Sequence, residues 1–502
     1  MVSVLAPLLL LLLLGSPPVV RAADHEDHYM IVEVRSLKSK GTCLGHRVIP
    51  STNNTWLPVE LRHGPCSPTL LDAAAAPSME ELLRRDQHRA EDVQRRLSNN
   101  GTDDSEAPGM AEGGGENDVI SGSKIVVGMG SRKPAATTMQ GSQVSVDHPT
   151  ATGGGGGGVG RVSTTLPPPG VMQTMVLDTA SDVPWVQCVP CPIPPCHPQK
   201  DPVYDPTTSP TYAAFSCNSP TCRQLGPYAN GCAANNQCQY RVAYPDGSSS
   251  SGTYISDMLT LNPTTTITSF QFGCSHADPG SFDNTTAGIM ALGGGPESLV
   301  SQTAARFGRT FSYCLPPSAS YLGFFMLGPR PLPSSSSRYL VTPMLRDTRA
   351  APTFYRVLLR AIVVGGRRLD IPAGGGGGGG AVMVMDSRTL ITRLPATAYQ
   401  ALRAAFMSGM RMYRAAPPKG SLDTCYDLAG VRSVKLPRIA MVFDREVTVE
   451  LDPSGILFNG CLAFAANRDD RTPGIVGSVQ QQTIEVHYDV AGGAVGFHRN
   501  AC

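Results

Sequence analysis

Two short stretches of the sequence echo each other: Met175-Val176-Leu177-Asp178-Thr179-Ala180-Ser181 and Met383-Val384-Met385-Asp386-Ser387-Arg388-Thr389. In each, an apolar run typical of a buried strand ends in an aspartate, and hydroxyl residues stand directly after it and two positions further on. Either motif alone is more typical of a strand that ends in a turn. Their repetition makes Asp178 and Asp386 candidates for a catalytic pair.

A pair of aspartates has a chemistry of its own. Two carboxylates held about 3 Å apart in a partly dry cleft cannot both ionise, so they share one proton. The ionised carboxylate can draw a proton from water while the protonated one polarises a carbonyl group. Such a pair hydrolyses a peptide bond without a covalent intermediate, so we predict no cofactor and no metal.

A second repeat follows the first. Apolar runs that end in glycine stand after each aspartate, at Ala287–Gly293 and at Pro473–Gly477. The two halves of the chain therefore repeat in the same order with different loop lengths. Two lobes that each contribute one aspartate are the simplest architecture.

The composition narrows the classes of fold and partner. The 502 residues include 41 Lys and Arg against 40 Asp and Glu, which gives no support for a nucleic-acid or polyanionic partner. The length suggests two to four domains or lobes. Abundant glycine and proline among short apolar runs favour a mostly β protein.

Residues 1–22 are typical of a signal peptide. The apolar run Leu5–Leu14 precedes a small-residue site at Val20-Arg21-Ala22. A membrane anchor is the alternative, but the run is shorter than the roughly 20 residues that span a bilayer. We therefore expect no membrane contact after signal removal, and a secreted protein in the extracellular space or cell wall, with the vacuole as an alternative.

Residues 23–150 are predicted to form a prosegment and linker. Ser78 is placed as the N-cap of a helix that runs to Leu97, with Glu81 completing a capping box. This basic helix either lies across the cleft as a removable prosegment or is a solvated surface helix. Glycine tracts such as Gly153–Gly158 predict a linker or flexible loop.

Cysteines crowd the segment after the first motif. Cys188-x-x-Cys191 is compatible with zinc or a redox pair, but no second such pair accompanies it. Disulfides in a loop insertion fit a secreted chain better. Further on, Tyr240–Ser248 predicts a hairpin, at whose shoulder Tyr244 either closes over a substrate or only packs.

Several motifs follow one another in a recognisable order: Asp178-Thr179-Ala180-Ser181, Trp185, the cysteine-rich insertion, Tyr244 with Asp246-Gly247-Ser248, Asp386-Ser387, Asp423-Thr424-Cys425-Tyr426 and Val479-Gln480-Gln481-Gln482. From about Met172 to Cys502 the chain resembles the nepenthesin-type aspartic proteases of plants, a branch of the pepsin family. The resemblance implies a mostly β, bilobal pepsin-like fold with an active cleft between two β lobes, at residues 151–340 and 341–502.

The resemblance also implies a role for each motif residue. Asp178 and Asp386 would be the catalytic pair of a secreted endopeptidase that is made as a zymogen and acts on a protein or peptide substrate. Thr179 and Ser387 would form a hydrogen-bond network between the lobes, and Ser181 and Thr389 would support the carboxylates. Tyr244 would be the tyrosine of a flap over the cleft. We expect a monomer.

The disulfides of the family would use every cysteine after the prosegment. They would pair Cys188 with Cys191, Cys196 with Cys274, Cys217 with Cys238, Cys222 with Cys232, Cys314 with Cys502 and Cys425 with Cys461. Cys43 and Cys66 are left over.

Two departures from the family pattern favour a second interpretation. Arg388 replaces the usual glycine of the second motif, and a guanidinium close to Asp386 could hold that carboxylate ionised. Pro245 replaces the usual flap glycine and removes a hydrogen-bond donor. The alternative to the enzyme is therefore a catalytically impaired pepsin-fold binding or inhibitor protein.

Three N-x-Ser/Thr triplets, at Asn53, Asn100 and Asn284, are candidate glycosylation sites if the chain is secreted. Such triplets also occur by chance, and only Asn284 lies within the expected lobes.

Overall fold

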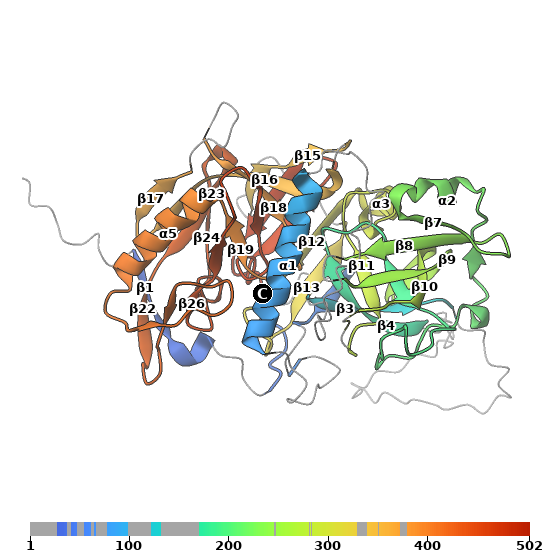
Figure 1. Cartoon of the computed structure of the whole chain (residues 1–502), viewed down its shortest axis with the longest axis horizontal. Coiled ribbons are helices and arrows are strands. Elements are labelled where there is room, and N and C mark those ends of the chain that lie inside the picture. Colours follow the sequence, from blue (N-terminus) through green and yellow to red (C-terminus); the bar gives the residue numbers. More distant parts are fainter. Residues whose placement is uncertain are drawn as a thin grey trace, which may run out of the picture.

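A computed structural model of the chain describes residues 28–37, 42–47, 55–61, 65–66, 78–98, 122–131, 170–244, 247–280, 282, 284–328, 339–349, 351–371 and 379–502. It confirms the predicted fold class, since strands dominate and two lobes flank helix α1 (Met79–Ser98) (Figure 1). Within these residues no helix is long and apolar enough to cross a bilayer. The predicted signal peptide lies outside them.

The N-terminal lobe is built on a nine-stranded sheet in the order β10-β5-β11-β4-β3-β9-β8-β7, with β6 beside β9. Its strands are β3 (Lys124–Met129), β4 (Val171–Asp178), β5 (Trp185–Gln187), β6 (Ala213–Ala214), β7 (Ala229–Cys232), β8 (Cys238–Ala243), β9 (Ser249–Asn262), β10 (Thr265–Ala277) and β11 (Gly288–Ala291). Strands β4 and β11 run parallel, with Asp178 opposite Ala291.

The C-terminal lobe repeats this arrangement. Its nine-stranded sheet has the order β24-β23-β16-β18-β28-β19-β27, with β15 and β17 beside β16. Its strands are β15 (Leu345–Asp347), β16 (Ala351–Val364), β17 (Arg367–Asp370), β18 (Ala381–Met385), β19 (Thr392–Leu394), β23 (Ile439–Phe443), β24 (Val447–Glu450), β27 (Phe464–Ala466) and β28 (Gly474–Val476). The series β4, β11, β5, β10 is matched by β18, β28, β19, β27, with the same parallel and antiparallel pairs. The repeat predicted from the sequence is therefore present in the fold.

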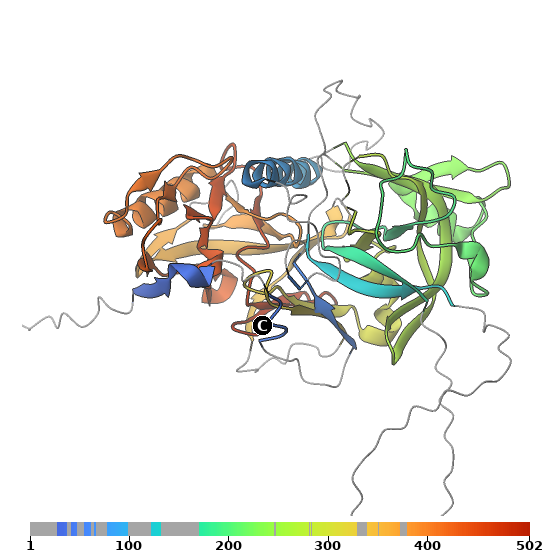
Figure 2. The ribbon, with the colours of Figure 1, turned by 90° about the horizontal axis from the view of Figure 1, so that it is seen from below.

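A six-stranded sheet joins the lobes, in the order β14-β30-β29-β12-β13-β2. Figure 2 shows α1 on one face of the molecule and this sheet toward the other, near the C-terminus. Its strands are β2 (Thr55–Val59), β12 (Thr310–Cys314), β13 (Gly323–Leu327), β14 (Leu340–Pro343), β29 (Glu485–Asp489) and β30 (Ala494–His498).

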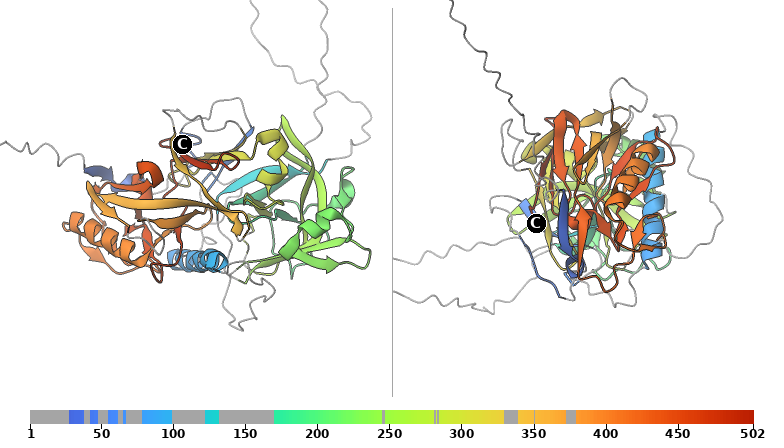
Figure 3. Two further views of the ribbon diagram at one scale, coloured as in Figure 1. Left: turned by 90° about the horizontal axis from the view of Figure 1, so that it is seen from above. Right: turned by 90° about the vertical axis from the view of Figure 1, so that its left-hand side faces the viewer.

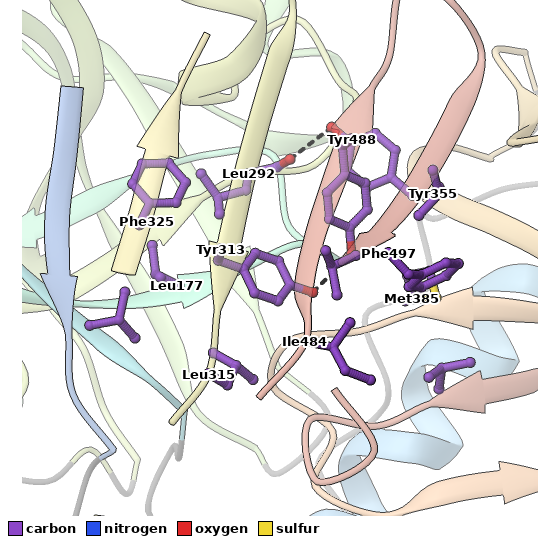
Figure 4. Close-up of a cluster of buried hydrophobic side chains, with 14 of the residues drawn as sticks. Leu177, Leu292, Tyr313, Leu315, Phe325, Tyr355, Met385, Ile484, Tyr488 and Phe497 are labelled. Atoms are coloured by element: carbon purple, nitrogen blue, oxygen red, sulfur yellow. Dashed lines mark hydrogen bonds between the residues drawn. The ribbon is translucent and has the colours of Figure 1, made fainter. Parts of the chain in front are cut away.

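The apolar core beneath the two aspartates is shared by both lobes. Leu177 in β4 directly precedes Asp178, and Met385 at the end of β18 directly precedes Asp386. Both side chains belong to one cluster with Tyr313, Tyr355 and Tyr488 (Figure 4). The polar ends of these rings are satisfied, since the Tyr313 and Tyr488 hydroxyls lie 2.9 Å apart and the Tyr355 hydroxyl donates to the Leu292 carbonyl at 2.8 Å. This packing fixes both strand ends relative to each other.

The predicted prosegment and linker contribute three strands to the fold. Strand β1 (Tyr29–Glu33) pairs with β22 (Ser433–Pro437), β2 with β13, and β3 with β4. Because β3 lies inside the N-terminal sheet, the N-terminal lobe includes residues before the predicted boundary at residue 151. The remaining elements are β20 (Ala415–Ala416), β21 (Cys425–Tyr426), β25 (Leu457–Phe458) and β26 (Cys461–Leu462), with helices α2 (Pro220–Gln224), α3 (Leu299–Gln302), α4 (Ala304–Phe307) and α5 (Ala396–Gly409).

The disulfides correct the pairing expected in the N-terminal lobe. Cys314–Cys502 and Cys425–Cys461 match the expected pairs. The four expected bonds Cys188–Cys191, Cys196–Cys274, Cys217–Cys238 and Cys222–Cys232 are wrong, because the structure pairs Cys188 with Cys274, Cys191 with Cys196, Cys217 with Cys232 and Cys222 with Cys238. Cys43 and Cys66 bond to each other.

Strand register explains the first of these pairs. The parallel pairing of β5 with β10 sets Cys274 opposite Val186, so the Cα atoms of Cys188 and Cys274 lie 5.3 Å apart. Cys232 and Cys238 face each other across β7 and β8, and each bonds to a cysteine of the preceding segment instead.

Candidate active site

Helix α1 lies on one face of the molecule, across the line where the lobes meet (Figure 3). Its buried side includes Leu83, Ala90 and Val93, which pack against strands and loops around both aspartates. The Ser78 hydroxyl accepts the Glu81 backbone N–H at 3.1 Å, as predicted for an N-cap. The Glu81 carboxylate does not close a capping box, because it pairs with the guanidinium groups of Arg84 and Arg85 instead.

Both candidate aspartates are fully buried, and the backbone holds them in the same way. The Ala180 N–H donates to Asp178 Oδ1 at 2.9 Å, and the Arg388 N–H donates to Asp386 Oδ1 at 3.0 Å. A backbone N–H survives replacement of the usual glycine, so both main-chain bonds remain.

Thr179 and Ser387 form the expected network between the lobes. The Ser387 hydroxyl accepts the Thr179 N–H at 3.2 Å, and the Thr179 hydroxyl accepts the Ser387 N–H at 3.0 Å. Each hydroxyl then donates at 3.1 Å to a carbonyl of the other lobe, that of Met385 for Thr179 and that of Leu177 for Ser387. The network sets the two motifs in one fixed register.

The two supporting hydroxyls are not equivalent. Thr389 Oγ1 donates to Asp386 Oδ2 at 2.7 Å, as the resemblance implied. Among the residues that the structure describes, Ser181 Oγ is buried and has no hydrogen-bond partner. The corresponding oxygen, Asp178 Oδ2, accepts from Arg388 Nη1 at 2.7 Å. The guanidinium expected beside Asp386 therefore pairs with the other aspartate.

A second guanidinium, that of Arg89 from α1, reaches both carboxylates. Its Nη2 lies 2.8 Å from Asp178 Oδ1 and 3.4 Å from Asp386 Oδ1, and its Nε lies 3.2 Å from Asp386 Oδ2. The sequence predicts a basic helix across the cleft as one of two alternatives, and Arg89 is not among the predicted site residues. Its position beside Ala90, between the apolar residues Leu83 and Val93, is the sequence feature that indicates a side chain facing the protein.

The charges around Asp178 favour its ionised form. Burial acts to raise the pKa of Asp178, but the Arg89 and Arg388 guanidiniums outweigh it and hold that pKa well below its ordinary value. While Arg89 lies against both carboxylates, a cation occupies the place of the shared proton, so this arrangement is a closed form of the site.

The predicted flap tyrosine lies over the same cluster. The Tyr244 hydroxyl accepts from Trp185 Nε1 at 2.8 Å, and Arg388 Cζ lies 5.5 Å from the centre of the Tyr244 ring. Burial raises the pKa of Tyr244 above its ordinary value, so the ring stays neutral. The ring packs in the N-terminal lobe and lies next to the guanidinium that pairs with Asp178. Pro245 and Asp246 lie outside the described residues.

Three further side chains fix the site. Gln481 Nε2 donates to the Asp386 backbone carbonyl at 3.0 Å. Two contacts anchor α1 to opposite lobes: Asp86 pairs with Arg393 at 2.7 Å, and Arg96 Nη1 donates to the Ala180 carbonyl at 2.9 Å. Two of these contacts end on the aspartate motifs, at Asp386 and at Ala180, and the third ends on β19.

The cysteine cluster does not fit a metal. Among the described residues, Cys191, Cys196 and Asp278 group closely enough for ligands. Both cysteines belong to one disulfide, so neither offers the thiolate that a zinc site needs.

Comparisons with known proteins cover both lobes. Residues 162–329 match the family model described as "Xylanase inhibitor N-terminal", and residues 354–499 match "Xylanase inhibitor C-terminal". An aspartyl protease family protein of Arabidopsis thaliana is 35% identical, over 96% of this chain and 94% of its own. The aspartic proteinase nepenthesin-2 of Nepenthes gracilis is 32% identical, over 65% of this chain and 74% of its own.

Among solved structures, the crystal structure of edgp has a TM-score of 0.56 and 18% identity, covering 90% of this chain and 96% of that one. The similarity in fold to this structure therefore spans both lobes. The Arabidopsis relative aligns along nearly the whole sequence and the family models match both lobes, which shows that the chain belongs to the pepsin-like family of plant aspartic proteases.

Proposed function

We propose that this chain is the precursor of a secreted aspartic endopeptidase, in which Asp178 and Asp386 activate the water that hydrolyses a peptide bond. The contact of Arg89 with both carboxylates carries the proposal. One planar guanidinium reaches two carboxylates only where they lie close together, and such closeness is what proton sharing requires.

The reaction follows once Arg89 leaves. Water takes its place between the carboxylates, and one proton is shared by the pair. The ionised carboxylate takes a proton from the water as its oxygen bonds to the peptide carbon, and the other gives its proton to the carbonyl oxygen. On collapse of this intermediate, a proton passes to the amide nitrogen and the C–N bond breaks. The Ala180 and Arg388 N–H groups keep each carboxylate oriented throughout.

Helix α1 would then act as a removable inhibitor. It fills the cleft with a cation for both aspartates, and its ties to Arg393 in one lobe and Ala180 in the other hold it across the gap. Acid pH favours the active form, because the pair must take up the proton that Arg89 excludes.

A pepsin-fold binding protein without catalysis is the second candidate. The ion pair between Arg388 and Asp178 favours it, because Arg388 follows β18 in the C-terminal lobe and does not leave with the prosegment. Such a lasting ion pair would disable catalysis if it kept the shared proton off both carboxylates.

One assay separates the two candidates. The purified full chain is acidified, and cleavage of a denatured protein is followed with and without a pepstatin-type transition-state mimic. Inhibitor-sensitive cleavage that Asp178→Asn and Asp386→Asn each abolish supports the enzyme. Absence of such cleavage at every acid pH, or equal cleavage by the Asp178→Asn protein, favours the binding protein.

Secretion and processing belong to the same proposal. We infer removal of residues 1–22, a monomeric product and a glycan at Asn284, which is exposed in the structure. The other two triplets, at Asn53 and Asn100, lie outside the described residues.

A further inference from the structure

We propose that Arg388 has taken over the role that the repeat gives to Ser181: it holds Asp178 as the carboxylate of the pair and leaves the shared proton to Asp386. This inference rests on the proposed function and names a positioning residue for that reaction. It assigns different tasks to two aspartates that the repeat makes equivalent.

The first motif departs from the repeat at its supporting hydroxyl. In the second motif, the hydroxyl three positions after the aspartate binds it, since Thr389 Oγ1 donates to Asp386 Oδ2 at 2.7 Å. In the first motif, the hydroxyl at the same position belongs to Ser181 and has no partner among the described residues. The oxygen that it would serve accepts from Arg388 Nη1 at 2.7 Å. One buried donor has thus replaced another.

Arg388 is also built into the site. Its side chain is only 6% exposed, and its guanidinium lies 5.5 Å from the centre of the Tyr244 ring. A Cβ added at Gly122 would lie 3.1 Å from Arg388 Cγ, so the arginine stem is closely packed. Its own N–H binds Asp386 Oδ1 at 3.0 Å while its side chain binds Asp178. One residue therefore orients both carboxylates, and it stays when α1 is removed.

Once α1 has gone, the charged groups at the aspartates are the two aspartates themselves and Arg388. Arg89 and Asp92 belong to α1 and leave with it. Burial raises the pKa of Tyr244, of Tyr313 on β12 and of Tyr488 on β29, so these rings stay neutral. With one proton on the pair, the two aspartates and Arg388 sum to zero charge.

The position of the Arg388 charge determines which of the two carboxylates carries the shared proton. The carboxylate next to the guanidinium is the poorer proton acceptor, so the proton resides on Asp386. Asp178 takes the proton of the attacking water, and Asp386 gives its proton to the carbonyl oxygen as the C–O bond forms. When the C–N bond breaks, Asp178 passes its proton to the leaving nitrogen and Asp386 recovers one from the hydroxyl group. The pair ends as it began.

The pH profile of kcat/KM after acid processing tests the proposal. In Arg388→Ala both limbs should move to higher pH by about one unit or more, the usual effect of a neighbouring arginine on an aspartate. Arg388→Lys should restore the parent position in part. Arg360→Ala, which removes a cation paired with Asp444 in the same lobe, should leave both limbs in place. Coincident limbs for Arg388→Ala and the parent overturn the proposal.

A double-mutant cycle tests the replacement of Ser181 directly. If Arg388 blocks its bond to Asp178, Ser181→Ala should reduce kcat/KM about tenfold more in the Arg388→Ala protein than in the parent, as expected for a hydrogen bond to a charged group. Equal effects in both backgrounds overturn the proposal.

Acid unfolding of the full chain gives a readout that needs no catalysis. A pKa held low by Arg388 gives stability above the unfolded value, and this stability is lost as pH falls through the folded value. In Arg388→Ala the loss should be smaller, and its end should shift to higher pH, because the folded pKa lies closer to the unfolded one. If this shift occurs and every protein lacks peptidase activity, the enzyme proposal fails while Arg388 still holds Asp178. If the full chain shows no shift, the proposed role of Arg388 fails even where cleavage is seen.

Discussion

Replacing Arg89 by methionine tests the closed form of the cleft without requiring catalysis. Methionine keeps an unbranched apolar stem and removes the guanidinium. The side chain is 8% exposed and approaches the carboxylates of Asp178 at 2.8 Å and Asp386 at 3.2 Å. We expect Arg89→Met to loosen α1 from the cleft while both lobes stay folded, because their cores do not include this residue.

The free-energy cost of losing the Arg89 guanidinium follows from the burial of its ion pairs. Removal of one partner from a buried ion pair costs about 3 to 5 kcal/mol. The lower end applies here, because the two carboxylates can take up a shared proton and Arg388 stays on Asp178. A cost of about 3 kcal/mol raises the fraction of molecules with α1 detached by about a hundredfold.

Amide hydrogen exchange of α1 in the full chain at neutral pH measures that fraction. Protection between Leu83 and Val93 should fall about a hundredfold in Arg89→Met. The matched control is Arg84→Met on the same helix, whose side chain is 42% exposed and pairs with Glu81. It should change protection by less than about threefold, because exposed pairs contribute little. Equal exchange in parent and Arg89→Met, or equal loss in both variants, would refute the reasoning.

Three further outcomes are expected. Burial, reinforced by Asp182, raises the pKa of Glu297 to about 7 from 4.5. A raised pKa gives stability that is complete below the unfolded value and lost as pH rises through the folded value, so the parent should lose up to about 3 kcal/mol between these pH values in urea titrations. Glu297→Gln should flatten this slope, and parallel curves would contradict the assignment. Ser387→Ala leaves the Thr179 N–H unpaired in the core and should cost about 2 kcal/mol, against less than about 0.5 for the exposed Ser408→Ala, with denaturant midpoints as the measure. Non-reducing peptide maps should recover Cys188 joined to Cys274, and a peptide joining Cys188 to Cys191 would show the strand register to be wrong.

The parts of the fold that could be predicted are those with a local pattern and a repeat. The apolar runs before Asp178 and Asp386 became β4 and β18, and the runs that end in Gly293 and Gly477 became their parallel partners. A Cβ at Gly293 would lie 2.6 Å from the Ser181 carbonyl, and one at Gly477 lies 2.6 Å from that of Leu390. The glycines therefore permit the same close approach in each lobe, and this contact made the repeat visible in the sequence.

The disulfides show what a sequence pattern cannot resolve. Cys217, Cys222, Cys232 and Cys238 are close enough along the chain for any pairing among them to close a short loop. Local pairing does not decide between them either: the register of β7 and β8 sets Cys232 opposite Cys238, yet each bonds to a cysteine of the preceding segment. Arg388 was misplaced for a related reason. Its neighbour in the chain is Asp386, but the side chain crosses to the other lobe, and only the assembled interface brings Asp178 within reach.

The choice of Arg89 among the arginines of α1 can nevertheless be argued from helical periodicity. Leu83, Ala90 and Val93 recur at spacings of seven and three, so they form one stripe that faces the protein. Arg89 and Arg96, seven apart, lie in a row beside this stripe and reach the first aspartate motif, at Asp178 and at the Ala180 carbonyl. Arg84 and Arg95 fall on the opposite side, with side chains 42% and 52% exposed. The periodicity thus selects the row of arginines that meets the cleft. Only the position of the carboxylates beneath α1 decides that Arg89 is the member of the row that meets both.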